Sequence, residues 1–176
     1  MISDKLAKAL NEQVNAEYYS AYLYHSMSAF MERAALKGTA NWLFVQAKEE
    51  MAHGINMYQY ILERGAVPVL TSVGQPQATF GDIEDVFRSV LEHEEKVTAL
   101  INAIASLAMQ EGDHACYQFI MWYVNEQVEE EANASDILSR IQMIGGDKGL
   151  LLSLDNELAA RTFVNPFPNN AKISGV

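Results

Sequence analysis

The stretch AKEEMAHG, residues 47–54, places two acids and a histidine in the middle of a long apolar helix pattern. Read at alternating steps of three and four residues, as a buried helix face requires, this region gives Leu43, Ala47, Glu50, Gly54, Met57 and Ile61. His53 lies one turn from Glu50, beside the same stripe. Metal-ligand side chains therefore stand where apolar residues belong, which predicts a helix that contributes ligands to a bundle core.

Three further segments carry the same kind of stripe, and each is interrupted at mid-length by a polar side chain. The interrupting residues are Glu17 in the first, Glu94 in the third, and Gln127 with Glu130 or Glu131 in the fourth. The periodicity predicts four long helices, at about 4–33, 38–66, 82–111 and 114–143. Every helix of the predicted bundle therefore supplies at least one ligand-type side chain.

The connections predict how these helices are ordered. Gly38-Thr39 and Gly112-Asp113 are short breaks, and short breaks make antiparallel neighbours. The segment from Val67 to Gly81 contains two prolines and has no periodic pattern. About 15 residues can run the length of a bundle, so the second and third helices are expected to be parallel. We predict an all-α fold: a four-helix bundle with one long crossover.

A short fifth helix is predicted near the C-terminus. Asp147 can cap it after Gly145-Gly146, and leucines dominate from Leu150 to Leu158. An apolar helix of this kind would promote aggregation if it were exposed to water. We therefore expect its packing partners to lie outside the monomer. The predicted division is one domain over residues 1–163 and a C-terminal coil tail over residues 164–176, which is rich in Pro, Asn, Ser and Gly.

The two halves of the chain repeat one another. A shift of 77 residues superimposes Glu17 on Glu94, and both halves keep a gap of 33 residues to the paired site in the next helix. The same shift brings together Glu49 with Glu126, Glu50 with Gln127, and His53 with Glu130. A repeat of this kind predicts a pseudo-twofold axis through one central site.

Charge decides what such a site must hold. An unpaired carboxylate in a low-dielectric interior costs several kcal/mol, and a whole domain is stable by only about 5–15 kcal/mol. Glu17, Glu50, Glu94 and Glu130 therefore either bind cations or carry protons, because no Lys or Arg lies on these stripes near mid-length. Four carboxylates and one imidazole suit two divalent ions, and this donor set favours iron or manganese over structural zinc.

These residues resemble the ferritin-like di-iron proteins, which use a Glu from each of two helices and Glu-x-x-His from each of the other two. Glu17 and Glu94 match the single glutamates, and Glu50-Met-Ala-His53 matches one full motif. The fourth helix departs from the pattern, with Gln127-Val-Glu-Glu130 in place of a second Glu-x-x-His. That departure argues against bacterioferritin and rubrerythrin and is similar to bacterial non-haem ferritin.

The resemblance implies roles for residues of this chain. Glu17, Glu50 and His53 would hold one iron, and Glu50, Glu94 and Glu130 the other, with Gln127 hydrogen-bonding nearby. The implied third iron site, on the cavity side, uses Glu49, Glu126 and Glu129 together with Glu130. Tyr24 and Trp122 match aromatic residues that are candidate electron donors near the centre.

The resemblance also implies an activity. Fe(II) would be oxidised at the di-iron centre by O2 or H2O2, and ferric oxide would be deposited in a cage of twenty-four subunits. Three alternatives remain open at this stage: an oxygen-activating di-iron enzyme with an organic substrate, a haem-binding bacterioferritin that uses Met51, and a metal-free structural bundle. Haem is not expected, since non-haem ferritins can carry a methionine at that position.

Composition narrows the class of protein further. The chain has 23 acidic and 12 basic side chains, a formal net charge of -11, which repels nucleic acid and favours cations as partners. The single cysteine, Cys116, excludes an internal disulfide and fits a reducing compartment. No apolar run reaches membrane-spanning length, and the N-terminus is too polar for a signal peptide. We therefore expect a cytoplasmic protein without membrane or nucleic-acid partners.

Overall fold

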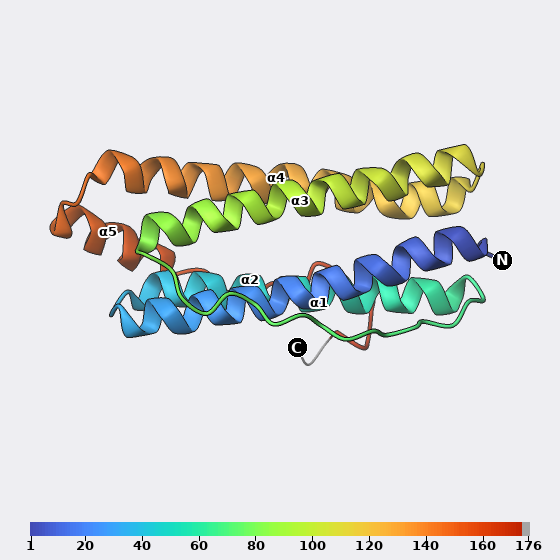
Figure 1. The fold of residues 1–176 in the computed structure, drawn as a ribbon, viewed down its shortest axis with the longest axis horizontal. Coiled ribbons are helices and arrows are strands. Elements are labelled where there is room, and N and C mark those ends of the chain that lie inside the picture. Colours follow the sequence, from blue (N-terminus) through green and yellow to red (C-terminus); the bar gives the residue numbers. More distant parts are fainter. Residues whose placement is uncertain (174–176) are drawn as a thin grey trace.

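The computed structural model describes residues 1–173 and contains five helices and no strand in that part of the chain. Four long helices form the bundle in Figure 1: α1 (Asp4–Arg33), α2 (Lys37–Glu63), α3 (Ile83–Gln110) and α4 (His114–Ile144). The short helix α5 (Lys148–Leu158) lies across one end. These bounds confirm the predicted elements to within three residues. No helix in the described chain is long and apolar enough to cross a membrane.

Local sequence explains where most of the helices begin. Ser3, Asp82, Asp113 and Asp147 are the N-cap residues of α1, α3, α4 and α5, and each side chain accepts a hydrogen bond from a backbone N–H of the first turn. Helix α2 is the exception, because its N-cap residue Leu36 has no side chain that can accept. Its first N–H groups must be satisfied by another part of the chain.

The long connection after α2 is a crossover, as predicted. Figure 1 shows it running back along the bundle from the end of α2 to the start of α3, so that α2 and α3 are parallel. Polar side chains of α1 hold it in place. Asn11 Oδ1 accepts from Val69 N at 2.7 Å, Asn15 donates to Thr71 O at 3.3 Å, and Ser26 donates to Gln77 O at 2.6 Å.

The bundle core consists of two apolar clusters separated by a polar layer. One cluster is built around Met27, Leu43 and Phe87, at the α5 end of the bundle. The other surrounds Leu10 and Ile120, at the opposite end. Buried polar side chains occupy the helix segments between the two clusters, among them Glu17, Glu50, His53, Glu94, Gln127 and Glu130. The predicted interruption of all four stripes is therefore confirmed, and Glu130 rather than Glu131 is the buried acid of α4.

Helix α5 departs from the prediction that its partners lie outside the monomer. Leu154 and Leu158 are buried in the first apolar cluster of the same chain. The carboxylate of Asp155 accepts hydrogen bonds from the Gly38 N–H at 3.0 Å and the Thr39 N–H at 2.7 Å. Asp155 thus supplies the cap that α2 lacks locally, a pairing that no sequence periodicity could indicate. Only the outer face of α5, with Leu150 and Leu152, is exposed in the monomer.

The segment after α5 contains no helix or strand through residue 173 and returns along the bundle. It packs against α2 and α4, with Ile173 buried and the Phe167 ring 4.4 Å from the Trp122 ring, centroid to centroid. Residues 174–176 of the predicted coil tail lie outside the described part. The tail therefore covers a face of the bundle near its polar layer.

Candidate metal centre

The polar layer brings three predicted ligands to one point. Glu17 of α1 and Glu50 and His53 of α2 each offer one ligand atom, and these atoms lie within 4.8 Å of one another. All three side chains are buried. Glu17 Oε2 and His53 Nε2 have no hydrogen-bond partner among the described residues. Buried polar atoms normally have a hydrogen-bond partner, so two buried atoms without one indicate a missing ligand. The trio therefore has the ligand types of a metal site and atoms free to bind a metal ion.

Glu94 and Glu130, the acids of α3 and α4, complete the polar layer but lie outside this trio. Glu94 accepts from the Tyr24 hydroxyl and from Gln127 Nε2, the latter at 3.1 Å. Glu130 accepts from Gln46 Nε2 at 2.6 Å. The structure therefore supplies each of these carboxylates with neutral donors, which support an anion without cancelling its charge.

Burial dominates the electrostatics of these acids. It raises the pKa of Glu17 and Glu50 well above the usual range; repulsion by Glu50 adds to the rise at Glu17, and repulsion by Glu94 adds to the rise at Glu50. Burial likewise raises the pKa of Glu94, and that of Glu130 to about 8. Without metal the layer therefore holds protons near neutral pH, so metal binding must release protons.

This proton uptake predicts an unusual pH dependence for the metal-free protein. Since the folded pKa values exceed the ordinary value of 4.5, the native state binds more protons than the unfolded state between about pH 4.5 and 8. The contribution of these protonated acids to the free energy of unfolding should be fully present below this pH window. It should be lost as pH rises through the window, which lowers stability by on the order of a few kcal/mol. We expect thermal unfolding in the presence of a chelator to move several degrees lower from pH 5 to pH 8. Glu130→Gln should flatten this slope, and an unchanged slope would contradict the raised pKa.

A second acidic group borders the trio. We call Glu49, Glu126 and Glu129 the outer carboxylates. Glu49 and Glu126 are partly buried, while Glu129 is exposed. Burial raises the pKa of both Glu49 and Glu126, and the Glu129 charge adds to this rise, as expected if the three lie near one another. Glu49 also has a partner that the sequence did not predict: it forms an ion pair with Arg161.

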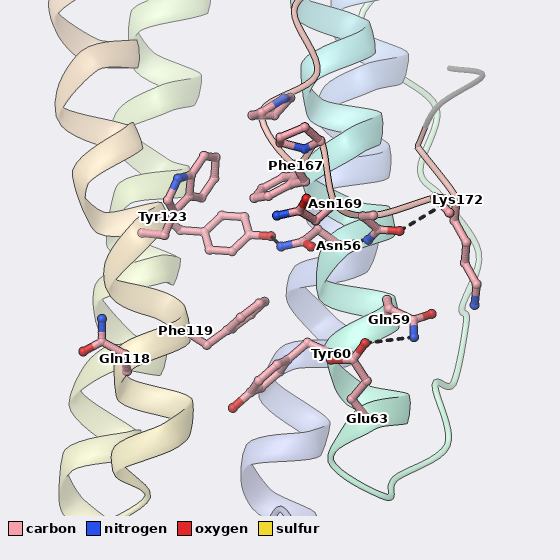
Figure 2. A pocket seen from close by; sticks show the side chains of 15 residues that line it. Asn56, Gln59, Tyr60, Glu63, Gln118, Phe119, Tyr123, Phe167, Asn169 and Lys172 are labelled. Carbon is pink, nitrogen blue, oxygen red and sulfur yellow. Dashed lines mark hydrogen bonds between the residues drawn. The ribbon is translucent and has the colours of Figure 1, made fainter.

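Aromatic rings border the centre on the α4 side. The Trp122 ring lies 5.5 Å from the His53 ring, and the Tyr123 hydroxyl donates to the His53 carbonyl at 3.2 Å. Figure 2 shows Tyr123 reaching from α4 towards Asn56 on α2, whose amide donates to its hydroxyl at 3.0 Å. Phe167 of the tail approaches from above this pair and lies 6.1 Å from His53. Trp122, Tyr123, Asn56 and Phe167 line a pocket of about 670 Å³ between α2, α4 and the tail.

Several residues near the centre were missed by the sequence prediction. Gln13, which donates to Glu17 at 2.8 Å, and Gln46 are buried amides one turn from a ligand. A glutamine on an inward stripe beside an acid was the available signal for both. Tyr123, Arg161 and Phe167 had no such signal, because their positions depend on how α4 and the C-terminal segment pack onto α2.

Together, the helical bundle with its single crossover and the buried carboxylate–imidazole layer define the ferritin-like class of helical metal-site proteins. Residues 7–144 match the family model described as a ferritin-like domain. A bacterial non-haem ferritin of Staphylococcus aureus (strain USA300) is 37% identical over 163 residues, covering 93% of this chain and 98% of that protein. The chain belongs to the ferritin family, and the predicted resemblance to bacterial-type non-haem ferritin is confirmed.

Other comparisons agree with this assignment. A probable bacterial non-haem ferritin-like protein of Haemophilus influenzae is 37% identical over 159 residues, 90% of this chain and 96% of that one. An engineered closed form of Archaeoglobus fulgidus ferritin superposes with a TM-score of 0.92 at 46% identity, covering 93% of this chain and all of that one. The open-pore ferritin of the same archaeon superposes with a TM-score of 0.91 at the same identity, covering 92% and 99%.

Proposed function

We propose that this protein stores iron: it oxidises Fe(II) at a di-iron centre in the polar layer and deposits ferric oxide inside a cage. The observation that carries the proposal is the convergence of Glu17, Glu50 and His53, buried with open valences between two apolar clusters. Membership of the ferritin family and the names of the relatives support iron as the cargo. The donor set of oxygen atoms and one imidazole suits iron.

We assign the ligands from the trio and, for Glu94 and Glu130, from the resemblance to ferritin-like di-iron proteins. Glu17, Glu50 and His53 hold the first Fe(II), and Glu50 bridges to a second ion that also takes Glu94 and Glu130. The hydrogen bonds from Gln127 and Gln46 hold Glu94 and Glu130 in the polar layer until metal arrives. Two divalent cations supply the positive charge that four buried carboxylates require, which removes the cost of their desolvation.

The reaction balances with iron as the substrate. Two Fe(II) ions each give up one electron; O2 accepts the pair together with two protons and leaves as H2O2. With H2O2 as the oxidant, the same two electrons and two protons give two molecules of water. A site that holds two ions allows both electrons to reach one oxidant, and it stabilises the charge that develops on oxygen. Tyr24, hydrogen-bonded to Glu94, and Trp122, beside His53, are the candidate electron donors near this centre.

Product iron leaves towards the interior of the cage. We assign the outer carboxylates, together with Glu130, as a third iron site on this route. The exposed leucines of α5, Leu150 and Leu152, are then buried between subunits of a homo-oligomer, with twenty-four subunits as the expected number. A cytoplasmic location fits the supply of Fe(II) and the single unpaired cysteine.

Aerobic addition of Fe(II) to the purified protein tests this function. We expect rapid formation of Fe(III) and a large particle that retains far more iron than its ligands can bind. The measurement is the iron-to-protein ratio across a size-exclusion peak, after excess iron has been removed with a chelator. Retention limited to two or three ions per subunit would show a metal-binding bundle without storage. Oxidation of Fe(II) only when an organic substrate is present would indicate a di-iron oxygenase instead.

A further inference from the structure

Arg161 is held beside Glu49, one of the outer carboxylates, by three independent contacts. Its backbone carbonyl accepts from Asn41 Nδ2 at 2.9 Å, which fixes the chain just after α5. Its guanidinium lies over the Trp42 ring, with Cζ 4.4 Å from the ring centroid. One guanidinium nitrogen, Nη2, donates to the carboxylate of Glu49. Backbone, stacking and ion-pair contacts together aim this cation at the edge of the metal centre.

The charge of Arg161 acts on more than its direct partner. Burial raises the pKa of Glu49, Glu126 and Glu130, and in each case the Arg161 charge opposes that rise. The ion pair is shielded from water, since the side chains of Arg161 and Glu49 are only 22% and 16% exposed. The second guanidinium nitrogen, Nη1, is buried and finds no hydrogen-bond partner among the described residues. The ion pair therefore leaves one buried nitrogen of Arg161 without a hydrogen bond. This lowers the free-energy cost of moving the guanidinium away from Glu49.

We propose that Arg161 is a tethered counter-cation that occupies the outer carboxylates in place of a third metal ion, so that iron leaving the di-iron centre must displace its guanidinium from Glu49. This inference rests on the proposed function and adds a regulating residue to it. Among the described residues Arg161 makes no hydrogen bond or ion pair with the trio, so it acts on the centre through its pair with Glu49 and through its charge. It is a positioning residue and not a catalytic one.

Competition between the guanidinium and a metal ion follows from elementary electrostatics. The guanidinium occupies one acceptor position of the Glu49 carboxylate, and a fixed positive charge beside that carboxylate repels a divalent cation. Arginine stays charged at all relevant pH values, so it cannot yield by losing a proton. It yields only by swinging away from Glu49. The third site is thus expected to bind metal weakly and briefly, as suits a point of passage towards the cage interior.

Zn(II) titration of the metal-free assembled protein tests this, because Zn(II) binds without oxidation. Calorimetry should resolve two tight ions per subunit and a weaker third in the natural protein. Arg161→Met removes the charge and keeps an apolar stem over Trp42. We expect it to tighten binding of the third ion about tenfold or more and to change binding of the first two ions much less. Arg161→Lys, which keeps the charge, should bind the third ion as the natural protein does.

Arg140→Met is the matched control, because Arg140 forms an exposed pair with Glu157 far from the outer carboxylates. It should change none of the three classes. A third class that is unchanged or weaker in Arg161→Met would overturn the proposal, since Arg161 would then be a structural ion pair or would help to present Glu49 to metal. If the natural protein bound no Zn(II) at two tight sites per subunit, that different result would overturn the proposed function itself.

A structure of the natural protein at saturating Zn(II) gives an independent measurement that needs no variant. With a third ion on the outer carboxylates, the guanidinium should have left Glu49 and lie elsewhere along Trp42. A third ion and the intact Arg161–Glu49 pair in the same subunit would contradict displacement, even if Arg161→Met failed to fold.

Discussion

Glu50→Ala is expected to slow aerobic oxidation of Fe(II) by roughly a hundredfold or more. Glu50 is the one carboxylate shared by both proposed iron positions, so its loss removes the bridge as well as a ligand from each ion. Metal-based stabilisation of a reacting oxygen is worth several kcal/mol, and each 1.36 kcal/mol is a factor of about ten in rate. The initial rate of Fe(III) formation at two Fe(II) per subunit measures this loss.

Loss of the Glu50 charge should not by itself destabilise the metal-free protein. Glu50 is buried, and desolvation raises its pKa, so its charged form opposes folding when metal is absent. Glu50→Gln, which keeps the volume, is therefore expected to raise thermal stability in chelator at pH 8 while losing oxidation activity. A folding defect would lower both quantities together. Glu50→Gln thus separates the two effects, because the oxidation rate should fall while the thermal unfolding temperature rises.

Glu63→Ala is the matched control for this experiment. Glu63 lies on the same helix but is exposed, and its carboxylate accepts a hydrogen bond from Gln59. Its removal should leave the oxidation rate unchanged. If Glu50→Ala retained the rate of the Glu63→Ala protein, the di-iron assignment would be wrong.

Gly38→Ala is expected to displace α5 and to destabilise the protein by about 4–7 kcal/mol. A Cβ atom at this position would lie 1.6 Å from the Asp155 carbonyl oxygen and 3.0 Å from the Ala159 nitrogen. Both are backbone atoms, so no side-chain rotation relieves the clash and α5 must move away. The move exposes Leu154 and Leu158, worth about 1.5–3 kcal/mol each, and removes the Asp155 cap from α2.

The measurements are thermal unfolding without metal, the size of the particle, and iron oxidation. The four-helix bundle and the trio do not contain α5, so initial oxidation should continue while assembly and iron retention fall. Gly149→Ala serves as the control, since its methyl group would meet nothing nearer than a side-chain oxygen of Asp147, at 3.3 Å. Equal stability and assembly in the two variants would show that α5 is not docked on α2 as the structure has it.

The amino-acid sequence determined the bundle and its polar layer. Helical periodicity placed the four long helices within three residues of their observed ends, and the length of the segment after α2 predicted the crossover. The interruption of each stripe identified Glu17, Glu50 and Glu94 as buried acids. These features are local, because a buried helix face must be apolar and any acid on it stands out against a short repeat.

Only the tertiary structure decided how segments far apart in the chain meet. It paired Asp155 with the start of α2, brought Arg161 to Glu49, and laid Phe167 beside Trp122. The sequence prediction that α5 finds its partners outside the monomer was wrong for Leu154 and Leu158 for this reason. An amphipathic pattern tells which face of a helix is buried, but the surface that buries it is chosen by the free energy of packing over the whole chain. The counter-ion of an exposed-looking glutamate is chosen in the same way, and no periodicity along the chain records that choice.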